Sequence, residues 1–382
     1  MSKQSGGVLT GIDVLVRNGF KTLHGSSLGL ITNHTGLTRE GQTTIDALHN
    51  APGVSLRALF GPEHGLRGDH DEDVADGLDP RTGLPAYSLF GARTRPAPEQ
   101  LAGLDTLVFD IQDIGCRFYT YVSTLGNVLE AAAAHGLRVV VLDRPNPIMG
   151  MATEGPLPDA DALSFVAYHP IPIRHGLTLG ELARLIHAEK GLSCPLTVIP
   201  CEHWQRGDWY DATGLLWTDP SPNMRRLSAA VLYPGVGLLE FTNVSVGRGT
   251  DTPFEVFGAP YVEPRPFAAA LNEAALPGVH FVPVRFTPSA SVFQSESCGG
   301  VQILLTDRDR LNAVQTGLTL ALTLLHLHPD AWQPEKLETL LTNETAYQAV
   351  AAGRAYEEIA AGWADDLKAF DARAEPHRLY VP

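Results

Sequence analysis

Cysteine is scarce in this chain of 382 residues, which has only Cys116, Cys194, Cys201 and Cys298. No two of them form a CxxC pair, and none stands with histidines at the spacing of a zinc site. We therefore expect free thiols in a reduced setting, and no bound metal or other cofactor. The acidic stretch 68–76, GDHDEDVAD, could offer oxygen ligands to a hard cation, but a solvated acidic loop is the favoured interpretation.

Positive charge is also in short supply. The chain has 28 Lys and Arg against 43 Asp and Glu, which gives a formal net charge of −15. This charge makes long-range binding to nucleic acid or to an anionic membrane unfavourable, so neither is an expected partner. A local basic pocket for an acidic small molecule is compatible with it.

Long apolar runs are missing as well. The first residues, MSKQSGGVLTGIDVLVRNGF, contain no apolar segment of signal-peptide length, and no run of about 18 apolar residues predicts a membrane span. We expect a cytoplasmic protein as the sequence stands, and a periplasmic or secreted one if the true start lies upstream.

Apolar segments alternate with helical patterns through the first 200 residues. This alternation is typical of an α/β fold, here a Rossmann-like parallel sheet covered on both faces. Thr178 and Glu181 form a capping box at the start of one predicted helix. Strands are predicted at 27–34, 54–60, 104–111, 137–143 and 196–200, and helices at 42–50, 124–136 and 177–191.

The second half of the chain predicts a smaller α/β domain. The stretch 244–266 is rich in Gly and Pro and is predicted to be loop. We place the domain boundary near residue 260, within this stretch. This gives a catalytic domain at 1–260 and a C-terminal domain at 261–382 that closes the active-site cleft. The expected elements are helices at 266–276 and 311–328, strands at 280–286 and 300–307, and a charged C-terminal helix.

Polar side chains follow four of the predicted strands. In open parallel sheets, ligands bind beyond the carboxyl ends of the strands, so we expect these groups at one edge of the sheet. Asp and Asn also favour turns and helix caps, which accounts for part of the pattern. The polar pairs are Asn33 and His34, Glu63 and His64, Asp110 and Asp113, and Asp143 and Arg144.

Glu63 is the member of this set that turn and cap preferences explain poorly. It stands in the pentapeptide GPEHG, where Pro62 restricts the backbone and Gly61 and Gly65 permit conformations that bulkier residues resist. A carboxyl group held on such a turn at the ligand edge of a sheet is suited to general acid catalysis. His64 either orients it, contacts the ligand or has a structural role.

Several longer stretches together resemble a known family. The most specific are FGPEHGLRGD, LVFDIQDIGCRFYTY, VVLDRPNP, IPIRHGLTLGELA, SPNM and YPGVGLLEFTNVSVGRGTDTPFEVFGAP. They are similar to the exo-acting β-N-acetylmuramidases, a glycoside hydrolase family formerly known as a domain of unknown function, over nearly the whole chain. The resemblance implies a Rossmann-like domain, a smaller α/β domain and an active site in the cleft between them.

The resemblance also implies an activity, the release of N-acetylmuramic acid from the non-reducing ends of peptidoglycan fragments such as muropeptides or the disaccharide with N-acetylglucosamine. The Glu of the family's P-E-H-G motif falls on Glu63, as general acid. Glycoside hydrolysis usually needs a second carboxylate, unless the 2-acetamido group of the sugar attacks instead. We place Asp113 with Glu63 in the catalytic set and leave Glu154, Glu240 and Asp251 as alternatives.

The lactyl carboxylate of N-acetylmuramic acid calls for an arginine, whose planar fork binds carboxylates. The matching motifs contain Arg67, Arg117, Arg174 and Arg248, and each of them could instead pair with a neighbouring acid. We favour Arg67 and Arg117, which follow the strand-end acids by four residues. The full predicted set for substrate binding is Asn33, His64, Arg67, Arg117, Tyr119, Glu154, Asn243 and Arg248.

Other functions on the same scaffold stay open, because a fold does not fix a function. A hydrolase of different specificity and a non-catalytic protein that binds amino sugars would both have a similar cleft. Turnover of an N-acetylmuramic acid glycoside distinguishes them from the muramidase.

Overall fold

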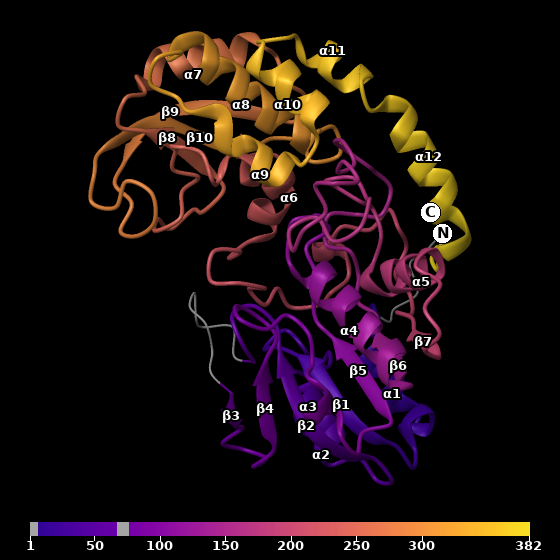
Figure 1. Cartoon of the computed structure of the whole chain (residues 1–382). Helices are drawn as coiled ribbons and strands as arrows, with labels where there is room; N and C mark the ends of the chain where they lie inside the picture. Colours follow the sequence, from indigo (N-terminus) through magenta and orange to yellow (C-terminus); the bar gives the residue numbers. More distant parts are fainter. Residues whose placement is uncertain (1–6, 67–75) are drawn as a thin grey trace.

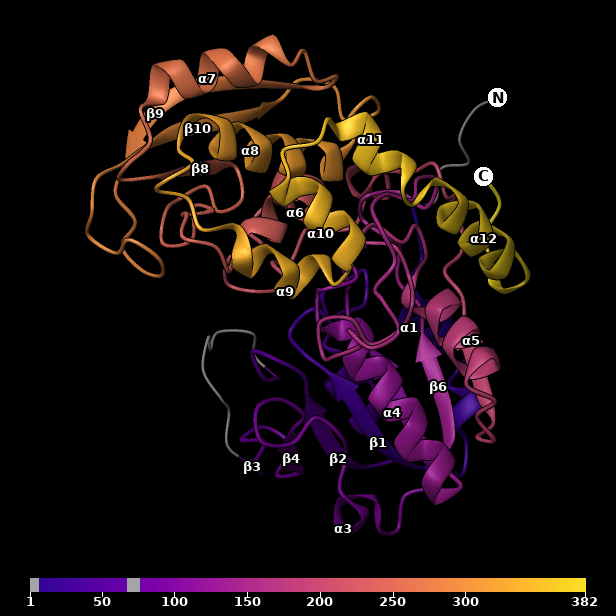
Figure 2. The same ribbon diagram turned by 45° about the horizontal axis from the view of Figure 1, so that its top comes forward.

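The computed structural model describes residues 7–66 and 76–382, which form two lobes (Figures 1 and 2). The first lobe is built on a seven-stranded sheet in the order β3-β4-β2-β1-β5-β6-β7, and the second on a three-stranded sheet in the order β8-β10-β9. The α/β prediction, with a Rossmann-like parallel sheet and a second, smaller domain, is confirmed. In the described part of the chain, no helix has the length and apolar character needed to cross a membrane.

The first sheet is parallel at every described strand pair except β3 with β4. The chain builds outward from the central strand β1, first to β2 on one side and later to β5 on the other, so the connections change direction beside β1. Ligands bind at such a point in open α/β sheets. The strands are β1 (Ser27–Thr32), β2 (Ser55–Gly61), β3 (Gly77–Leu78), β4 (Pro85–Ser88), β5 (Thr106–Asp110), β6 (Arg138–Leu142) and β7 (Leu196–Ile199).

Both faces of this sheet are buried, because strand side chains alternate between two apolar layers. Leu107 and Phe109 of β5 face the helices α4 (Tyr121–His135) and α5 (Leu179–Glu189), whereas Val108 faces the opposite layer. That layer contains α1 (Gly11–Arg17) and α2 (Thr44–His49). The short α3 (Pro98–Leu101) precedes β5. The predicted capping box of α5 is present, with Thr178 accepting from the Glu181 amide.

The second lobe packs its helices on a small antiparallel sheet. Helix α8 crosses α6 closely, since a Cβ added at Gly317 of α8 would stand 2.1 Å from the carbonyl oxygen of Gly235 in α6. Glycine therefore sets the distance between these helices. The elements are α6 (Leu227–Val236), β8 (Val256–Ala259), α7 (Pro264–Glu273), β9 (Val279–Phe286), β10 (Cys298–Leu305), α8 (Ala313–Leu327), α9 (Glu338–Leu341), α10 (Glu344–Ala351), α11 (Tyr356–Ala361) and α12 (Ala364–Ala374).

The loop prediction for 244–266 is wrong at its centre. Residues 256–259 form β8, which pairs antiparallel with β10 in register from Gly299 opposite Ala259 to Gln302 opposite Val256. Tertiary pairing with a strand 40 residues later overrides the local Gly and Pro content. The boundary after residue 260 stays a prediction, and the placement of β8 in the second sheet favours a division N-terminal to it.

The C-terminal segment returns to the first lobe. Figures 1 and 2 show α11 and α12 running from the second lobe down to the side of α5. The Leu379 amide donates to Glu181 over 2.8 Å, and the Tyr380 hydroxyl donates to Asp143 over 2.5 Å. The two lobes are thus joined by this returning segment as well as by the chain that leads into α6.

Candidate active site

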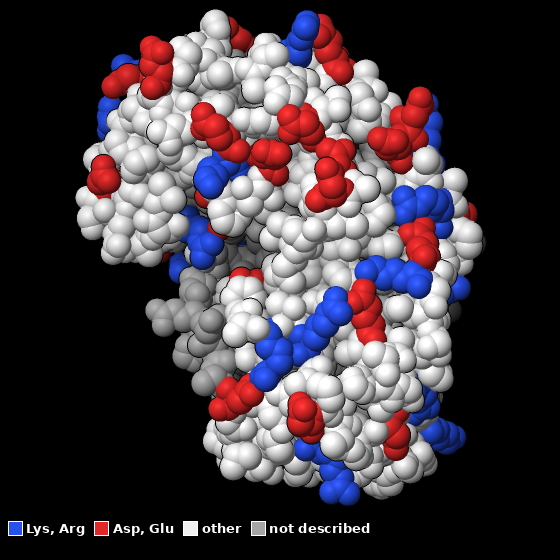
Figure 3. All heavy atoms as spheres, in the orientation of Figure 1, with Lys and Arg blue, Asp and Glu red and all other residues white. Residues whose placement is uncertain are grey.

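A cavity of about 170 Å³ lies where the two lobes meet. The first lobe contributes the turn after β2 and the segment before α4, and the second contributes the residues around α6 and the loops that follow it. Figure 3 shows a hollow between the lobes on this face, with basic side chains at its rim on the side of the second lobe. The lining is Glu63, His64, Phe118, Tyr119, Thr120, Val166, Ser221, Asn223, Met224, Tyr233, Glu240, Phe241, Arg248, Phe254 and Leu340.

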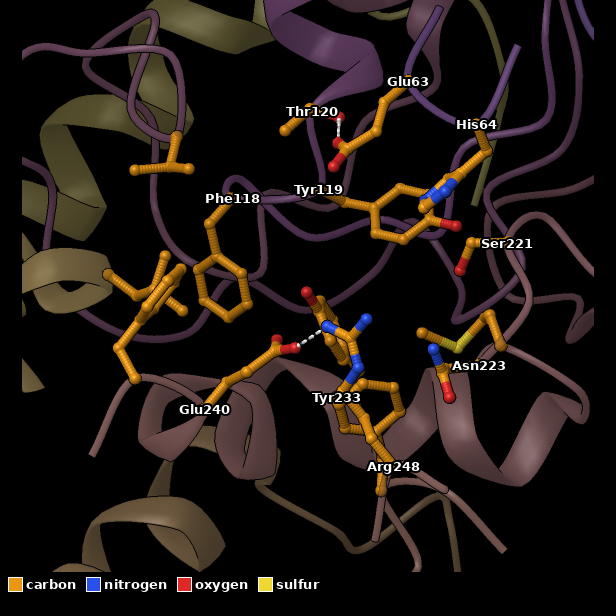
Figure 4. Close-up of a pocket in the computed structure, with 15 residues that line it drawn as sticks. Glu63, His64, Phe118, Tyr119, Thr120, Ser221, Asn223, Tyr233, Glu240 and Arg248 are labelled. Carbon is orange, nitrogen blue, oxygen red and sulfur yellow. Dashed lines mark hydrogen bonds and ion pairs between the residues drawn. The ribbon is translucent and has the colours of Figure 1, made fainter. Parts of the chain in front are cut away.

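Glu63 reaches this cavity because of the backbone that carries it. His64 and Gly65 both adopt left-handed conformations, with φ of 69° and 71°, immediately after β2. A left-handed histidine is uncommon, and such backbone strain concentrates at functional sites. The Thr120 hydroxyl donates a hydrogen bond of 2.5 Å to Oε2 of Glu63, as Figure 4 shows. The turn after β2 and the start of α4 therefore hold one carboxyl group at the cavity wall.

Aromatic side chains form much of the wall between the lobes. The ring of Tyr119 makes edge contacts with Tyr121 and Tyr233, at centroid distances of 5.0 and 5.9 Å. Burial raises the pKa of Tyr233 well above its usual value, and the carboxylates of Glu240 and Glu63 act in the same direction. Burial also raises the pKa of Tyr119. Both phenols are therefore neutral and add no negative charge to the site.

A second carboxylate, Glu240, lines the cavity together with Arg248, and the two form an ion pair. Figure 4 places this pair on the opposite side of the view from Glu63 and Thr120. Glu240 follows the short 3-10 helix Gly237–Leu239 that continues α6. The close packing of α6 against α8 therefore fixes both Tyr233 and the segment that carries Glu240.

The structure brings four predicted site residues to the cavity: Glu63, His64, Tyr119 and Arg248. Glu240, one of the alternatives for the second carboxylate, joins them. Asn33, Asp113, Arg117, Glu154 and Asn243 are not part of its lining. Arg67 and the acidic stretch up to residue 75 lie outside the described residues.

Two of these outlying residues stand at strand ends as expected but support the fold. Asn33 accepts hydrogen bonds from the amide and hydroxyl of Thr35 and donates to the Tyr121 hydroxyl over 3.0 Å. Asp113 is buried, accepts from the Gly115 amide over 2.7 Å, and has its carboxylate 3.6 Å from Nε2 of buried His175. Asp113 thus stabilises the turn after β5.

Arg117 does not point into the cavity. It is 1% exposed, and its guanidinium donates to the carbonyl oxygens of four residues and to the Thr342 hydroxyl. Burial lowers its pKa to about 10. The four carbonyls belong to Pro156, Ile171, Leu340 and Leu341. Arg117 therefore joins α9 to the first lobe, and its expected contact with substrate has no support in this geometry.

Glu154 and Asn243 are likewise committed to structural contacts. Glu154 pairs with Arg174 over 2.5 Å and accepts from the Val314 amide at the start of α8. Asn243 donates to the Ala331 carbonyl and accepts from the Gln333 amide, both over 2.8 Å. Their motifs therefore specify how the two lobes are joined and how the second lobe is folded.

Three further strand-end residues, Asp110, Asp143 and Arg144, form a buried network. Arg144 pairs with Asp110 over 2.6 Å, with both side chains almost fully buried. Asp143 accepts from the amides of Arg144 and Gly180 and from the hydroxyls of Thr178 and Tyr380. Burial raises the pKa of Asp143 to about 6, against the opposing effect of these donors. Of the four polar pairs after the strands, only Glu63 and His64 line the cavity.

Residue-level reasoning missed Thr120, Ser221, Asn223 and Tyr233, which all line the cavity. A signal for them existed, because they fall inside the resembling stretches LVFDIQDIGCRFYTY, SPNM and YPGVGLLEFTNV. Nothing in those stretches tells which side chains face a ligand. In the described part of the chain, no group of three or more His, Cys, Asp or Glu side chains is placed to hold a metal ion.

Known proteins show similarity along nearly the whole chain. Two family models match it, described as exo-beta-N-acetylmuramidase NamZ, N-terminal, over residues 28–228 and C-terminal over residues 231–380. The chain is 41% identical over 378 residues to the peptidoglycan beta-N-acetylmuramidase NamZ of Bacillus subtilis strain 168. That alignment covers 98% of this chain and 91% of the relative.

Solved structures agree with the fold. A DUF1343 family protein from Bacteroides fragilis superposes with a TM-score of 0.92 and 38% identity, covering 99% of this chain and 100% of the other. A second DUF1343 family protein from the same organism superposes with a TM-score of 0.78 and 29% identity, covering 98% and 99%. The two lobes and their arrangement are therefore shared with proteins of known structure.

Proposed function

This chain belongs to the exo-beta-N-acetylmuramidase NamZ family, and we propose that it hydrolyses the glycosidic bond of terminal N-acetylmuramic acid in peptidoglycan-derived fragments. The observation that carries the proposal is the position of Glu63. Its carboxyl group stands in a cavity between two lobes, on a strained turn at the switch point of a parallel sheet. In this proposal the cavity takes the terminal sugar of the chain.

Glu63 acts as the general acid in this proposal. It donates its proton to the glycosidic oxygen while the bond from that oxygen to the anomeric carbon breaks, and the sugar passes through an oxocarbenium-like state. The hydrogen bond from Thr120 leaves the other carboxyl oxygen of Glu63 to carry the proton. Water, directly or after the sugar's own 2-acetamido oxygen, attacks the anomeric carbon, and the proton that this water releases restores the Glu63 acid. Both routes need the same proton on the leaving oxygen.

The test is the kinetics of Glu63→Gln on two substrates, the disaccharide and a p-nitrophenyl glycoside of N-acetylmuramic acid. We expect kcat on the disaccharide to fall by about 10²–10⁴-fold, the usual contribution of general acid–base catalysis. The loss on the aryl glycoside should be smaller, because its leaving group needs little protonation. Near-normal turnover of the disaccharide by a folded variant would exclude Glu63 as the acid.

The wild-type protein also separates this function from its alternatives. It should release p-nitrophenol from the N-acetylmuramic acid glycoside and not from the N-acetylglucosamine glycoside. A protein that only binds amino sugars would bind these glycosides without releasing p-nitrophenol from either of them. A hydrolase of different specificity would prefer the second substrate.

A further inference from the structure

We propose that Arg248, held in place by Glu240, binds the lactyl carboxylate of N-acetylmuramic acid and makes the cavity selective for that sugar. The proposal deepens the proposed function, because it assigns the substrate's acidic group to a particular wall of the cavity. Arg248 is the binding residue here, and Glu240 is a positioning residue that acts through it.

The position of Arg248 is the first observation. Among the described residues that line the cavity, it is the one Lys or Arg side chain, and one third of that side chain is exposed. Glu240 is less exposed, at 15%, so the arginine is the more accessible partner of the pair. Figure 4 shows the guanidinium reaching toward the interior, opposite the wall that carries Glu63. A sugar seated between these walls would have its scissile bond at one side and its substituent at the other.

The other described arginines of the family motifs are committed elsewhere. The guanidinium of Arg117 is buried among backbone carbonyls that join the two lobes. Arg174 is 4% exposed, pairs with Glu154 and donates to the carbonyl of Ile148. Neither one can reach a ligand in the cavity without dismantling a buried network.

Charge balance in the cavity supports the assignment. The lining contains two carboxyl groups, Glu63 and Glu240, and the phenols of Tyr119 and Tyr233 are neutral. Because Glu63 carries its proton in the proposed function, Glu240 is the negative charge that would repel a carboxylate-bearing sugar if Arg248 were absent. In the proposed complex, the Arg248 guanidinium contacts both Glu240 and the lactyl carboxylate of the sugar. Its planar fork of N–H donors suits a carboxylate. N-acetylglucosamine has no lactyl group and gains nothing from this contact.

The experiment measures binding, so it does not depend on turnover. Calorimetry compares free N-acetylmuramic acid with its lactyl methyl ester on the wild type, Arg248→Met, Arg248→Lys and Glu240→Gln. We expect the wild type to bind the acid about 10–100-fold more tightly than the ester, as one charge-assisted hydrogen-bonded contact allows. Arg248→Met should bring this ratio close to one, and Arg248→Lys should leave it between the two.

Controls separate a binding role from a structural one. Arg265 lies exposed on α7 of the same lobe, outside the cavity lining, so Arg265→Met should keep the wild-type ratio. The double variant Arg248→Met/Glu240→Gln avoids an orphaned carboxylate if the single variant folds poorly, and it should also lose the preference. Because a structural role would weaken acid and ester equally, the ratio distinguishes the two roles.

Three results would overturn the proposal. They are equal binding of acid and ester by the wild type, a wild-type ratio in the folded double variant, and loss of the ratio in Arg265→Met. If Glu240→Gln abolished hydrolysis of the aryl glycoside while keeping the acid preference, Glu240 would be a nucleophile and its positioning role would be wrong. A wild type that binds the acid selectively but releases no p-nitrophenol would keep this proposal and exclude the proposed hydrolase.

Discussion

The hydroxyl of Thr120, at the N-cap of α4, donates to the carboxylate of Glu63, on the turn after β2, across 57 positions of the sequence. Strands β2 and β5 flank β1 in the sheet, and this hydrogen bond connects the loops that follow them. The bond thus spans the switch point at which an open α/β sheet binds its ligands. It makes Thr120 a positioning residue for the proposed acid.

We predict that Thr120→Val lowers kcat on the disaccharide by about tenfold, which corresponds to about 1.4 kcal/mol. The isosteric side chain fills the same space but cannot hold Oε2 of Glu63, so the carboxyl group samples unproductive rotamers. Steady-state kinetics on the disaccharide measure the effect. Thr120→Ser keeps the hydroxyl and should recover most of the rate. Equal losses in the Val and Ser variants would point to packing instead.

Arg117→Met should destabilise the protein by on the order of 3 kcal/mol, measured by urea unfolding. Four buried carbonyls lose their donor, and each unsatisfied buried group costs about 1–3 kcal/mol before the structure relaxes. The preference for N-acetylmuramic acid over its ester should persist in the folded fraction. A stable variant without that preference would return Arg117 to the substrate site.

Asp143 should make stability depend on pH between about 4 and 6. Its pKa is raised from 3.8 to about 6 in the fold, so the folded state keeps a proton that the unfolded state releases in this window. The resulting stabilisation is complete below pH 3.8 and is lost as the pH rises through 6, on the order of 3 kcal/mol in total. Urea unfolding across this range measures the slope.

Tyr380→Phe tests the contribution of Asp143 by removing one of its hydrogen-bond donors. The variant keeps the ring contact with Trp204, at a centroid distance of 4.8 Å, but removes the donor that favours the ionised carboxylate. The pKa of Asp143 should therefore rise further. We expect the stability difference from the wild type to be smaller at pH 4 than at pH 8, where it should reach about 1–3 kcal/mol. A difference independent of pH would show that Asp143 is not the responsive group.

Local pattern was enough to predict the layered first lobe. Near-continuous apolar runs such as 104–111 and 137–143 are typical of parallel strands covered by helices on both faces, and they became β5 and β6. The position of Glu63 followed from the same reasoning, because the carboxyl ends of parallel strands share an edge. The turn itself was visible in GPEHG, whose residues suit a strained backbone.

Strand ends did not show which polar groups face a ligand, because burial depends on segments far away in the chain. Asp143 and Glu63 both follow strands. Asp143 is covered by Tyr380 from the C-terminal segment, whereas Glu63 lines the cavity between the two lobes. Likewise, sequence spacing favoured Arg117 over Arg248 as the partner of the lactyl carboxylate. Only packing showed that one guanidinium is surrounded by carbonyls of α9, while the other lies at the cavity beside Glu240.

The second lobe was hardest to predict for the same reason. Residues 256–259 have no strong strand pattern of their own, and β8 exists because β10 supplies its hydrogen bonds from 40 residues away. Local chemistry fixes where a chain turns and what a side chain can do. Which side chains end up facing one another across the cavity is decided by contacts between segments distant in sequence, since burial and partners set both orientation and charge.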